Sequence, residues 1–358
     1  MPLKLKHMEL ANSWAQILGK LLRKEALDRR EADWAMTKIM AGDATDAQVG
    51  AFMLALRSKG ETVDELAGLV DVMLRNAVIL DTGNDAVDIV GTGGDLVGTV
   101  NISSMAAILT SASGIPVMKH GSRSASGKTG SSEMLEVLGI RLDLSPERVA
   151  DVFREVGITF FFAPVFHPSM RYVAPIRKEL EIPTTFNFLG PLANPAQPIA
   201  TSLGVANGEI APLMAQEVAS RGRSALVFRG KDGLDELTTT SESDIWEVAG
   251  GEVRHSVLNP NNLGLSTSSV NDLIGGDAQH NALVAKALFE GKFDGPIADI
   301  VRLNAAAGVV AYELARDHNL IDVPLLERFD SALVRVTEAL RSGAAAEKLS
   351  DWMSATQA

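Results

Sequence analysis

The most unusual stretch of the sequence, residues 119–131, combines many small, polar and cationic side chains. It reads KHGSRSASGKTGS and holds three cations, three glycines and five hydroxyl residues in 13 positions. The apolar run at 115–118, directly before it, predicts a buried strand. Lysine, arginine and hydroxyl donors bind phosphate oxygens, and glycines let backbone amides approach them. We favour a phosphate-binding loop over a plain surface loop, which seldom needs this density of glycine and hydroxyl groups.

A second glycine-rich segment, GTGGD at 91–95, follows the predicted strand at 87–90. The helix expected after it, opened by NISS at 101–104, offers free amides and the positive end of a helix dipole. An ordinary turn between strand and helix explains the glycines equally well, and neither common nucleotide fingerprint applies. The carboxyl ends of neighbouring parallel strands face one crevice. Two such loops together therefore predict a ligand with more than one phosphate group.

Three further candidates carry charge or a titratable ring. Asp235 and Glu236, in GLDELTTT, are hard oxygen ligands suited to Mg²⁺, although an isolated pair of this kind is more often a solvated acidic turn. Arg177 could hold a carboxylate through two hydrogen bonds, or could be a solvated helix residue. His120 could be a base or a structural histidine. The other histidines are scattered, and no nucleophile motif is present.

Composition narrows the class of protein. The 358 residues are 46% hydrophobic, enough for a substantial core, and contain no cysteine, which excludes disulfides and thiolate metal sites. A net charge of -12 argues against a general nucleic-acid binder. No stretch of 18 uncharged apolar residues predicts a membrane span, and the amino-terminal residues are not typical of a secretory signal. A cytoplasmic protein with a small-molecule ligand is the expectation.

The elements that must position these residues fall into two groups. Residues 10–80 show only helical periodicity, with capping boxes at 45–48 and 62–65 and a terminating glycine, Gly60. From residue 86, short apolar runs alternate with helical patterns, which indicates a mostly parallel sheet with helices on both faces. Gly250 and Gly251 predict a tight turn between two short strands. The proline-rich segment 167–195 interrupts the alternation and is expected to return to the helical region.

The expected fold class is therefore α/β: a small all-helical amino-terminal domain and a larger α/β domain with a mostly parallel central sheet flanked by helices. We place the helical domain at 1–80, with about 167–195 returning to it. The α/β domain then comprises 81–166 and 196–358.

In this order, the motifs GTGGD, NISS, KHGSRSASGKTGS, HPSMRYVAPIRKELEI, FNFLGPLANP and GLDELTTT resemble anthranilate phosphoribosyltransferases over nearly the whole chain. The resemblance implies transfer of a phosphoribosyl group from phosphoribosyl pyrophosphate to anthranilate, in tryptophan biosynthesis. It also implies Mg²⁺ as cofactor, two ions per subunit, and a homodimer formed through the helical domain. It implies neither a covalent intermediate nor a strong catalytic acid or base.

The resemblance also implies roles for individual residues. Those that match the family's phosphoribosyl pyrophosphate site are Gly91, Gly94, Asp95, Thr99, Asn101, Ser103, Ser104, Lys119, His120, Gly121, Ser122, Arg123, Ser124, Ala125, Ser126, Gly127 and Ser131. Gly91, Ser122 and Arg177 match the anthranilate site. Ser103, Asp235 and Glu236 match the Mg²⁺ site.

One position departs from the family pattern. The family loop usually reads KHGNRA, whereas this chain reads KHGSRS, so Ser122 replaces an amide near anthranilate with a hydroxyl. An aromatic amine other than anthranilate is therefore an alternative acceptor. Two rival functions share the fold: a pyrimidine-nucleoside phosphorylase and a non-catalytic nucleic-acid-binding relative. The acidic pair disfavours the first and the net negative charge disfavours the second.

Overall fold

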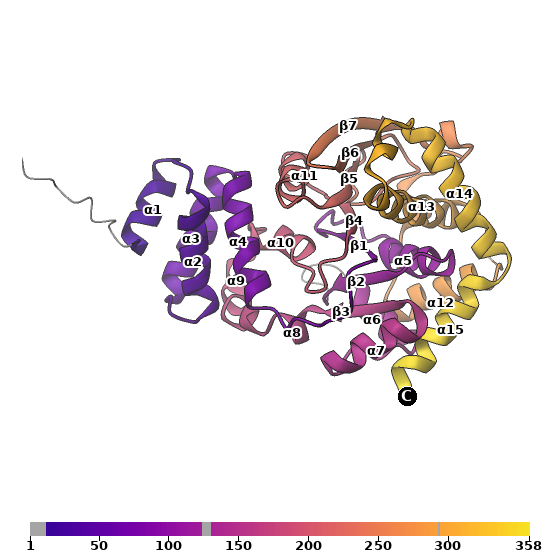
Figure 1. Ribbon diagram of the computed structural model, residues 1–358, viewed down its shortest axis with the longest axis horizontal. Helices are drawn as coiled ribbons and strands as arrows, with labels where there is room; N and C mark the ends of the chain where they lie inside the picture. Colours follow the sequence, from indigo (N-terminus) through magenta and orange to yellow (C-terminus); the bar gives the residue numbers. More distant parts are fainter. Residues whose placement is uncertain (1–11, 124–129, 293) are drawn as a thin grey trace, which may run out of the picture.

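The computed structural model describes residues 12–123, 130–292 and 294–358. A helical bundle and a larger α/β part lie side by side, joined by the chain near α8, α9 and α10 (Figure 1). The bundle consists of α1 (Trp14–Leu22), α2 (Arg29–Met40), α3 (Asp46–Lys59) and α4 (Val63–Arg75). No helix in the described parts of the chain is both long enough and apolar enough to cross a membrane.

The first helices begin where their side chains can satisfy free backbone amides. Thr45 caps α3 and Thr62 caps α4, each in a complete capping box with the residue three positions later. Gly60 ends α3 with a φ of 88°, a conformation that side-chain-bearing residues rarely adopt. The predicted start and stop signals in this region are therefore confirmed.

A seven-stranded sheet forms the centre of the α/β part, in the order β3-β2-β1-β4-β5-β6-β7. Its strands are β1 (Val87–Gly91), β2 (Val117–Gly121), β3 (Ile158–Phe162), β4 (Ala200–Gly204), β5 (Ser224–Gly230), β6 (Ser243–Ala249) and β7 (Glu252–Leu258). The first five strands run parallel, and β6 and β7 add an antiparallel hairpin. The hairpin turns at Gly250 and Gly251, as predicted. Sequence analysis identified no strand at β4.

Helices cover both faces of the sheet. They are α5 (Ile102–Ala112), α6 (Ser131–Val137), α7 (Pro146–Val156), α11 (Ala211–Ser220), α12 (Ala278–Phe289), α13 (Pro296–Arg316), α14 (Leu325–Arg341) and α15 (Ala344–Gln357). The predicted α/β class with a mostly parallel sheet is thus confirmed. The chain leaves β1 toward β2 and β3, and returns beside β1 at β4 before continuing to β5. The order of strands reverses between β1 and β4, which is where open α/β sheets bind ligands.

Two apolar cores lie on opposite faces of the sheet. Val87 and Ile89 point into a core with α5, α13 and the carboxyl-terminal helices, whereas Val90 points into a second core. That second core also contains Val173 and Phe186, together with side chains of the helical bundle and α11. The segment 167–195 supplies α9 (Ala174–Leu180) and α10 (Phe186–Leu189), preceded by α8 (Ala163–Phe166). The bundle, this segment and one sheet face therefore share one continuous apolar interior.

Gly68 on α4 allows the closest approach within the bundle. A Cβ built there would lie 2.5 Å from the Arg29 carbonyl oxygen and 2.9 Å from Ala32 Cβ on α2. We predict that Gly68→Ala lowers the melting temperature, although alanine favours a helix by about 1 kcal/mol over glycine, because α2 must move away. Gly50→Ala on α3 is the matched control, since its Cβ would meet only Ile176 at 3.7 Å. Thermal unfolding that shows equal effects for both variants would contradict the prediction.

Candidate functional site

The glycine-rich loop after β1 and the helix that follows it are hydrogen-bonded to the acidic pair after β5. The Gly93 amide donates to Asp235 Oδ2 at 2.7 Å, and the Ser103 amide, in the first turn of α5, donates to Glu236 Oε1 at 3.1 Å. A Cβ on Gly91 would collide with the Asp235 carboxylate, and one on Gly204 with the Asp235 backbone. Both strand ends therefore need glycine, since the acidic turn packs directly against them.

Burial and like charge perturb both acidic side chains. Burial, then the neighbouring Asp95 carboxylate, raise the pKa of Asp235 to about 7. Burial and the adjacent Asp235 raise the pKa of Glu236 well above its ordinary value. A cation that lies among these carboxylates would favour their charged forms.

The chain itself supplies one cation at this point. Lys119 is 2% exposed, and its ammonium group donates to the Ile89 carbonyl and to Ser103 Oγ, the latter at 3.3 Å. Burial lowers the Lys119 pKa, while Asp88, Glu236 and Asp235 oppose that shift. Because β2 extends to Gly121, Lys119 and His120 lie inside a strand. They are not in the loop after it, where the sequence pattern had placed them.

The second glycine-rich loop begins and ends beside the first. Ser131 Oγ donates to the Ser122 carbonyl at 3.4 Å, and Asn101 Nδ2 donates to the Gly130 carbonyl at 3.2 Å. Arg123 pairs with Glu136 at 2.8 Å. The predicted residues Ser124, Ala125, Ser126 and Gly127 lie outside the described residues.

The other predicted residues lie around these two loops. Gly94 is exposed with a φ of 87°, and Asp95 accepts from the Val97 amide at 3.1 Å. Thr99 forms a bridge with Ile274, and Ser104 Oγ is buried without an acceptor or donor among the described residues. The structure thus brings together Gly91, Asp95, Ser103, Lys119, Asp235 and Glu236.

Arg177 comes from a different part of the chain. It lies on α9, the helix that packs on α3 of the bundle, and its guanidinium has no acidic partner among the described residues. Burial lowers the pKa of Arg177. A carboxylate ligand would compensate its charge, which is the chemistry predicted for this residue.

A buried network behind the loops was not predicted. Asp88 Oδ1 accepts from the His120 amide at 3.0 Å, and Asp88 Oδ2 accepts from Asn194 Nδ2 at 2.9 Å. Asn194 Nδ2 also donates to the Met118 carbonyl at 2.8 Å, which ties the proline-rich segment to β1 and β2. Burial raises the pKa of Asp88 to about 6, against the opposing charge of Lys119. The sequence does contain a signal for this network. Asp88 lies inside the apolar run VDIV, and a buried charge needs hydrogen-bonding or charged partners.

Asn281 is a second residue that sequence analysis missed. It is 1% exposed on α12, accepts from the Gly276 amide at 2.8 Å, and donates from Nδ2 to Asn101 Oδ1 at 2.9 Å. Asn101 in turn reaches the end of the second loop. Nothing near Asn281 in the sequence marks this role, because its partner lies 180 positions away.

Comparison with known proteins agrees with this geometry. Residues 15–77 match the helical bundle domain of a glycosyl transferase family and residues 83–346 match its a/b domain. The chain is 52% identical to the anthranilate phosphoribosyltransferase of Leifsonia xyli subsp. xyli, over 98% of this chain and 100% of that protein. The chain belongs to the anthranilate phosphoribosyltransferase family. The family predicted from the motifs is confirmed.

Solved structures of this family share the fold. The anthranilate phosphoribosyltransferase of Thermus thermophilus superposes with a TM-score of 0.87 at 37% identity, covering 96% of this chain and 99% of that one. The Saccharomyces cerevisiae enzyme in complex with PRPP and Mg gives 0.85 at 26% identity, over 96% and 98%. A second structure of the yeast enzyme, with 4-fluoroanthranilate, gives 0.82 at 26% identity, over 96% and 99%.

Two buried histidines stand beside the site, with ring centroids 5.2 Å apart. His120 Nδ1 lies 3.0 Å from the Gly190 carbonyl and His167 Nε2 lies 3.0 Å from the Ala193 carbonyl, so each of these nitrogens carries the proton. His120 Nε2 is buried without a partner among the described residues. Burial lowers the pKa of His120 to about 3, helped by His167, and lowers that of His167 to about 4.

These lowered pKa values predict that the folded protein loses stability as the pH falls. Between about pH 6.5 and 4 the unfolded chain protonates both rings while the folded chain does not, so their stabilising contribution falls as pH falls. His167→Gln removes one such ring. Between pH 7.5 and 5.5 we expect the variant to lose about 1 kcal/mol less unfolding free energy than the unchanged protein. Urea unfolding at both pH values measures this difference. The raised pKa of Asp88 changes the unfolding free energy equally in both proteins, so its effect cancels. Equal losses would contradict the prediction.

Proposed function

We propose that the protein transfers the phosphoribosyl group of 5-phosphoribosyl 1-pyrophosphate to the amine of anthranilate, releasing pyrophosphate. The single observation that carries this proposal is the convergence of two glycine-rich loops, Lys119 and the Asp235–Glu236 pair at the carboxyl ends of β1, β2 and β5. Full-length similarity to anthranilate phosphoribosyltransferases favours this reaction over the phosphorylase and the nucleic-acid-binding relative.

The acidic cluster fits Mg²⁺. No group of three His, Cys, Asp or Glu side chains is arranged as a complete metal site in the parts of the chain that the structure describes. That suits Mg²⁺, which proteins usually hold by one or two carboxylates plus substrate phosphates. Asp235, Glu236 and Ser103 would hold it, and we propose two ions per subunit. When bound, Mg²⁺ supplies positive charge that stabilises the departing pyrophosphate.

The protein's own groups promote the reaction by positioning the two substrates and by stabilising the charge that develops. The bond from C1 of the ribose to the pyrophosphate oxygen breaks, the bond from C1 to the amine nitrogen forms, and the amine loses a proton. Backbone amides of the glycine loops and the first turn of α5 would face the developing negative charge, except those of Gly93 and Ser103, which donate to the acidic pair. A strong base is unnecessary, because the amine becomes acidic as the new bond forms. His120, with its low pKa and its ring held by Gly190, serves structure rather than proton transfer.

Arg177 would orient the acceptor. Its guanidinium, which has no acidic partner in the described part of the chain, suits the anthranilate carboxylate, and Gly91 and Ser122 complete the proposed acceptor site at the ends of β1 and β2. Holding the acceptor in place converts a bimolecular encounter into an oriented one. Because Arg177 lies on the segment that packs against the helical bundle, the acceptor site would draw on both parts of the molecule.

The homodimer and the location in the cytoplasm remain proposals. Leu22 on α1 and Leu54 on α3 are 78% and 50% exposed, which supports an interface on the helical bundle. The proposed domain division, with 167–195 belonging to the bundle, is supported by the packing of α9 on α3 and of α10 on α4.

Loss of anthranilate fluorescence on mixing with phosphoribosyl pyrophosphate and Mg²⁺ tests the reaction. We expect rapid loss that EDTA abolishes. Arg177→Ala should lower kcat/KM for anthranilate about 30-fold, the worth of a hydrogen bond to a charged group, with little change in KM for the donor. Lys178→Ala, one position along on an exposed part of α9, is the matched control. Equal losses in both variants would contradict the role of Arg177.

No fluorescence loss, while phosphoribosyl pyrophosphate still binds by calorimetry, would reject anthranilate as the acceptor. Ser122→Asn would then restore the amide that relatives usually carry. Recovery of activity in that variant would assign the acceptor preference to this position.

Asn281 provides a test of how the loops are held. We predict that Asn281→Ala raises KM for phosphoribosyl pyrophosphate about tenfold, because Asn101 loses one hydrogen bond that helps to orient it toward the second loop. Since the chemical groups remain, kcat should change less. Asn262→Ala, at an exposed position on a surface turn, is the control. A fall in kcat with KM unchanged would show that Asn281 does not act through donor binding.

A further inference from the structure

A cavity of about 540 Å³ lies away from the two glycine-rich loops. Its walls come from Asn84 before β1, the segment 197–199 before β4, the turn 220–224 between α11 and β5, and three single side chains. The three single side chains are Arg29, Ala315 and His318. The cavity therefore lies at the amino ends of the parallel strands, whereas the glycine-rich loops follow their carboxyl ends.

The charge of this cavity is opposite to that of the whole protein. Its described lining includes three arginines and a histidine but no aspartate or glutamate, in a chain of net charge -12. Amide and hydroxyl groups of Asn84, Gln197, Ser220 and Ser224 stand beside the cations. A volume of this size suits a small molecule.

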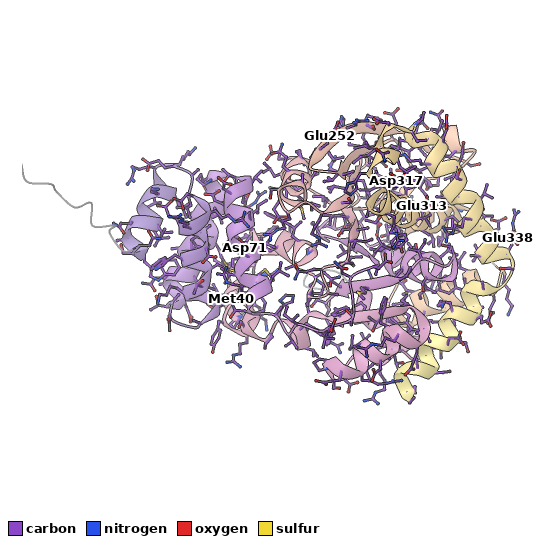
Figure 2. The ribbon with its side chains drawn as sticks, in the orientation of Figure 1. Met40, Asp71, Glu252, Glu313, Asp317 and Glu338 are labelled. Atoms are coloured by element: carbon purple, nitrogen blue, oxygen red, sulfur yellow. The ribbon has the colours of Figure 1, made fainter. Side chains whose placement is uncertain are left out.

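Two of the three arginines are already neutralised. Arg29 and Arg221 both bind Asp71 of α4, at 2.6 and 2.8 Å, and Arg221 also contacts the buried Glu217. Figure 2 labels Asp71 on the side of the bundle nearest the α/β part. These contacts connect the helical bundle to the turn after α11, so the cavity is bounded by both parts of the molecule.

The third arginine of the cavity, Arg223, is not neutralised in this way. Its Nη2 donates to the Pro198 carbonyl at 2.7 Å, but its buried Nε–H has no acceptor among the described residues. Burial lowers its pKa, with Glu217 and Asp88 only partly opposing the shift. A guanidinium whose Nε–H is buried without an acceptor is costly unless an anion joins it.

We propose that this cavity is a second anion site, which binds a phosphate or carboxylate group of a small molecule on Arg223. The neighbouring amides and hydroxyls would hold the rest of the ligand. The bound anion would touch Arg29 of the bundle and the α11–β5 turn together, and so stabilise their contact. The site is distinct from the proposed transfer site, because it shares no residue with the two glycine-rich loops.

Calorimetry on the full-length protein tests the proposal. Inorganic phosphate, pyrophosphate and citrate are titrated at constant ionic strength, without phosphoribosyl pyrophosphate, Mg²⁺ or anthranilate. We expect at least one of them to bind, and the comparison of phosphate with citrate identifies the group preferred. Arg223→Gln should weaken that binding at least about tenfold, and Arg29→Gln about threefold. Arg254→Gln, on exposed β7, should leave it unchanged.

Two results would overturn the proposal. The first is absence of binding by all three anions up to about 10 mM. The second is binding that Arg223→Gln does not weaken, in which case the arginines only neutralise the negative carboxyl end of α11. Circular dichroism checks that Arg223→Gln folds. If it does not, Arg29→Gln, whose side chain is 48% exposed, decides the question alone.

Discussion

The proposed site depends on the hydrogen bonds that Asp235 and Glu236 accept in the turn after β5. The two carboxylates accept from the amides of Gly93 and Ser103, so they fix both the loop after β1 and the start of α5. This arrangement needs room at the ends of β1 and β4, which Gly91 and Gly204 provide. It also concentrates negative charge, which the buried Lys119 offsets only in part. A bound cation is the natural completion of such a site.

A second constraint is the common interior of the helical bundle and the sheet. Val90 and Leu203 point from the sheet into the same apolar core as the bundle side chains, with α10 between the bundle and the sheet (Figure 1). Arg177 is therefore carried by an element whose position is set by packing against α3. Displacement of the bundle relative to the sheet would move Arg177 relative to the glycine-rich loops.

Charge is distributed unevenly over this acidic protein. The carboxyl edge of the sheet gathers carboxylates around one lysine, while the amino edge gathers arginines around a cavity without acidic lining residues. Burial raises the pKa of the carboxyl groups at one edge and lowers that of Arg223 at the other. In both places burial leaves charge incompletely matched, and in both the missing partner would be an ion or a ligand of opposite sign.

The sequence by itself determined the class of fold, the helix caps and the place of the two glycine-rich loops after β1 and β2. Those features depend on local chemistry: apolar periodicity, capping side chains, and glycines at strand ends. It could not place β4 or show that Lys119 is buried inside β2. Nor could it find Asn194 and Asn281, whose partners lie far away in the chain. Only the tertiary structure brings Asp88 to Asn194, Asn101 to Asn281 and Arg29 to the cavity beside Arg223, because these contacts follow from the crossing of strands and helices rather than from neighbouring residues.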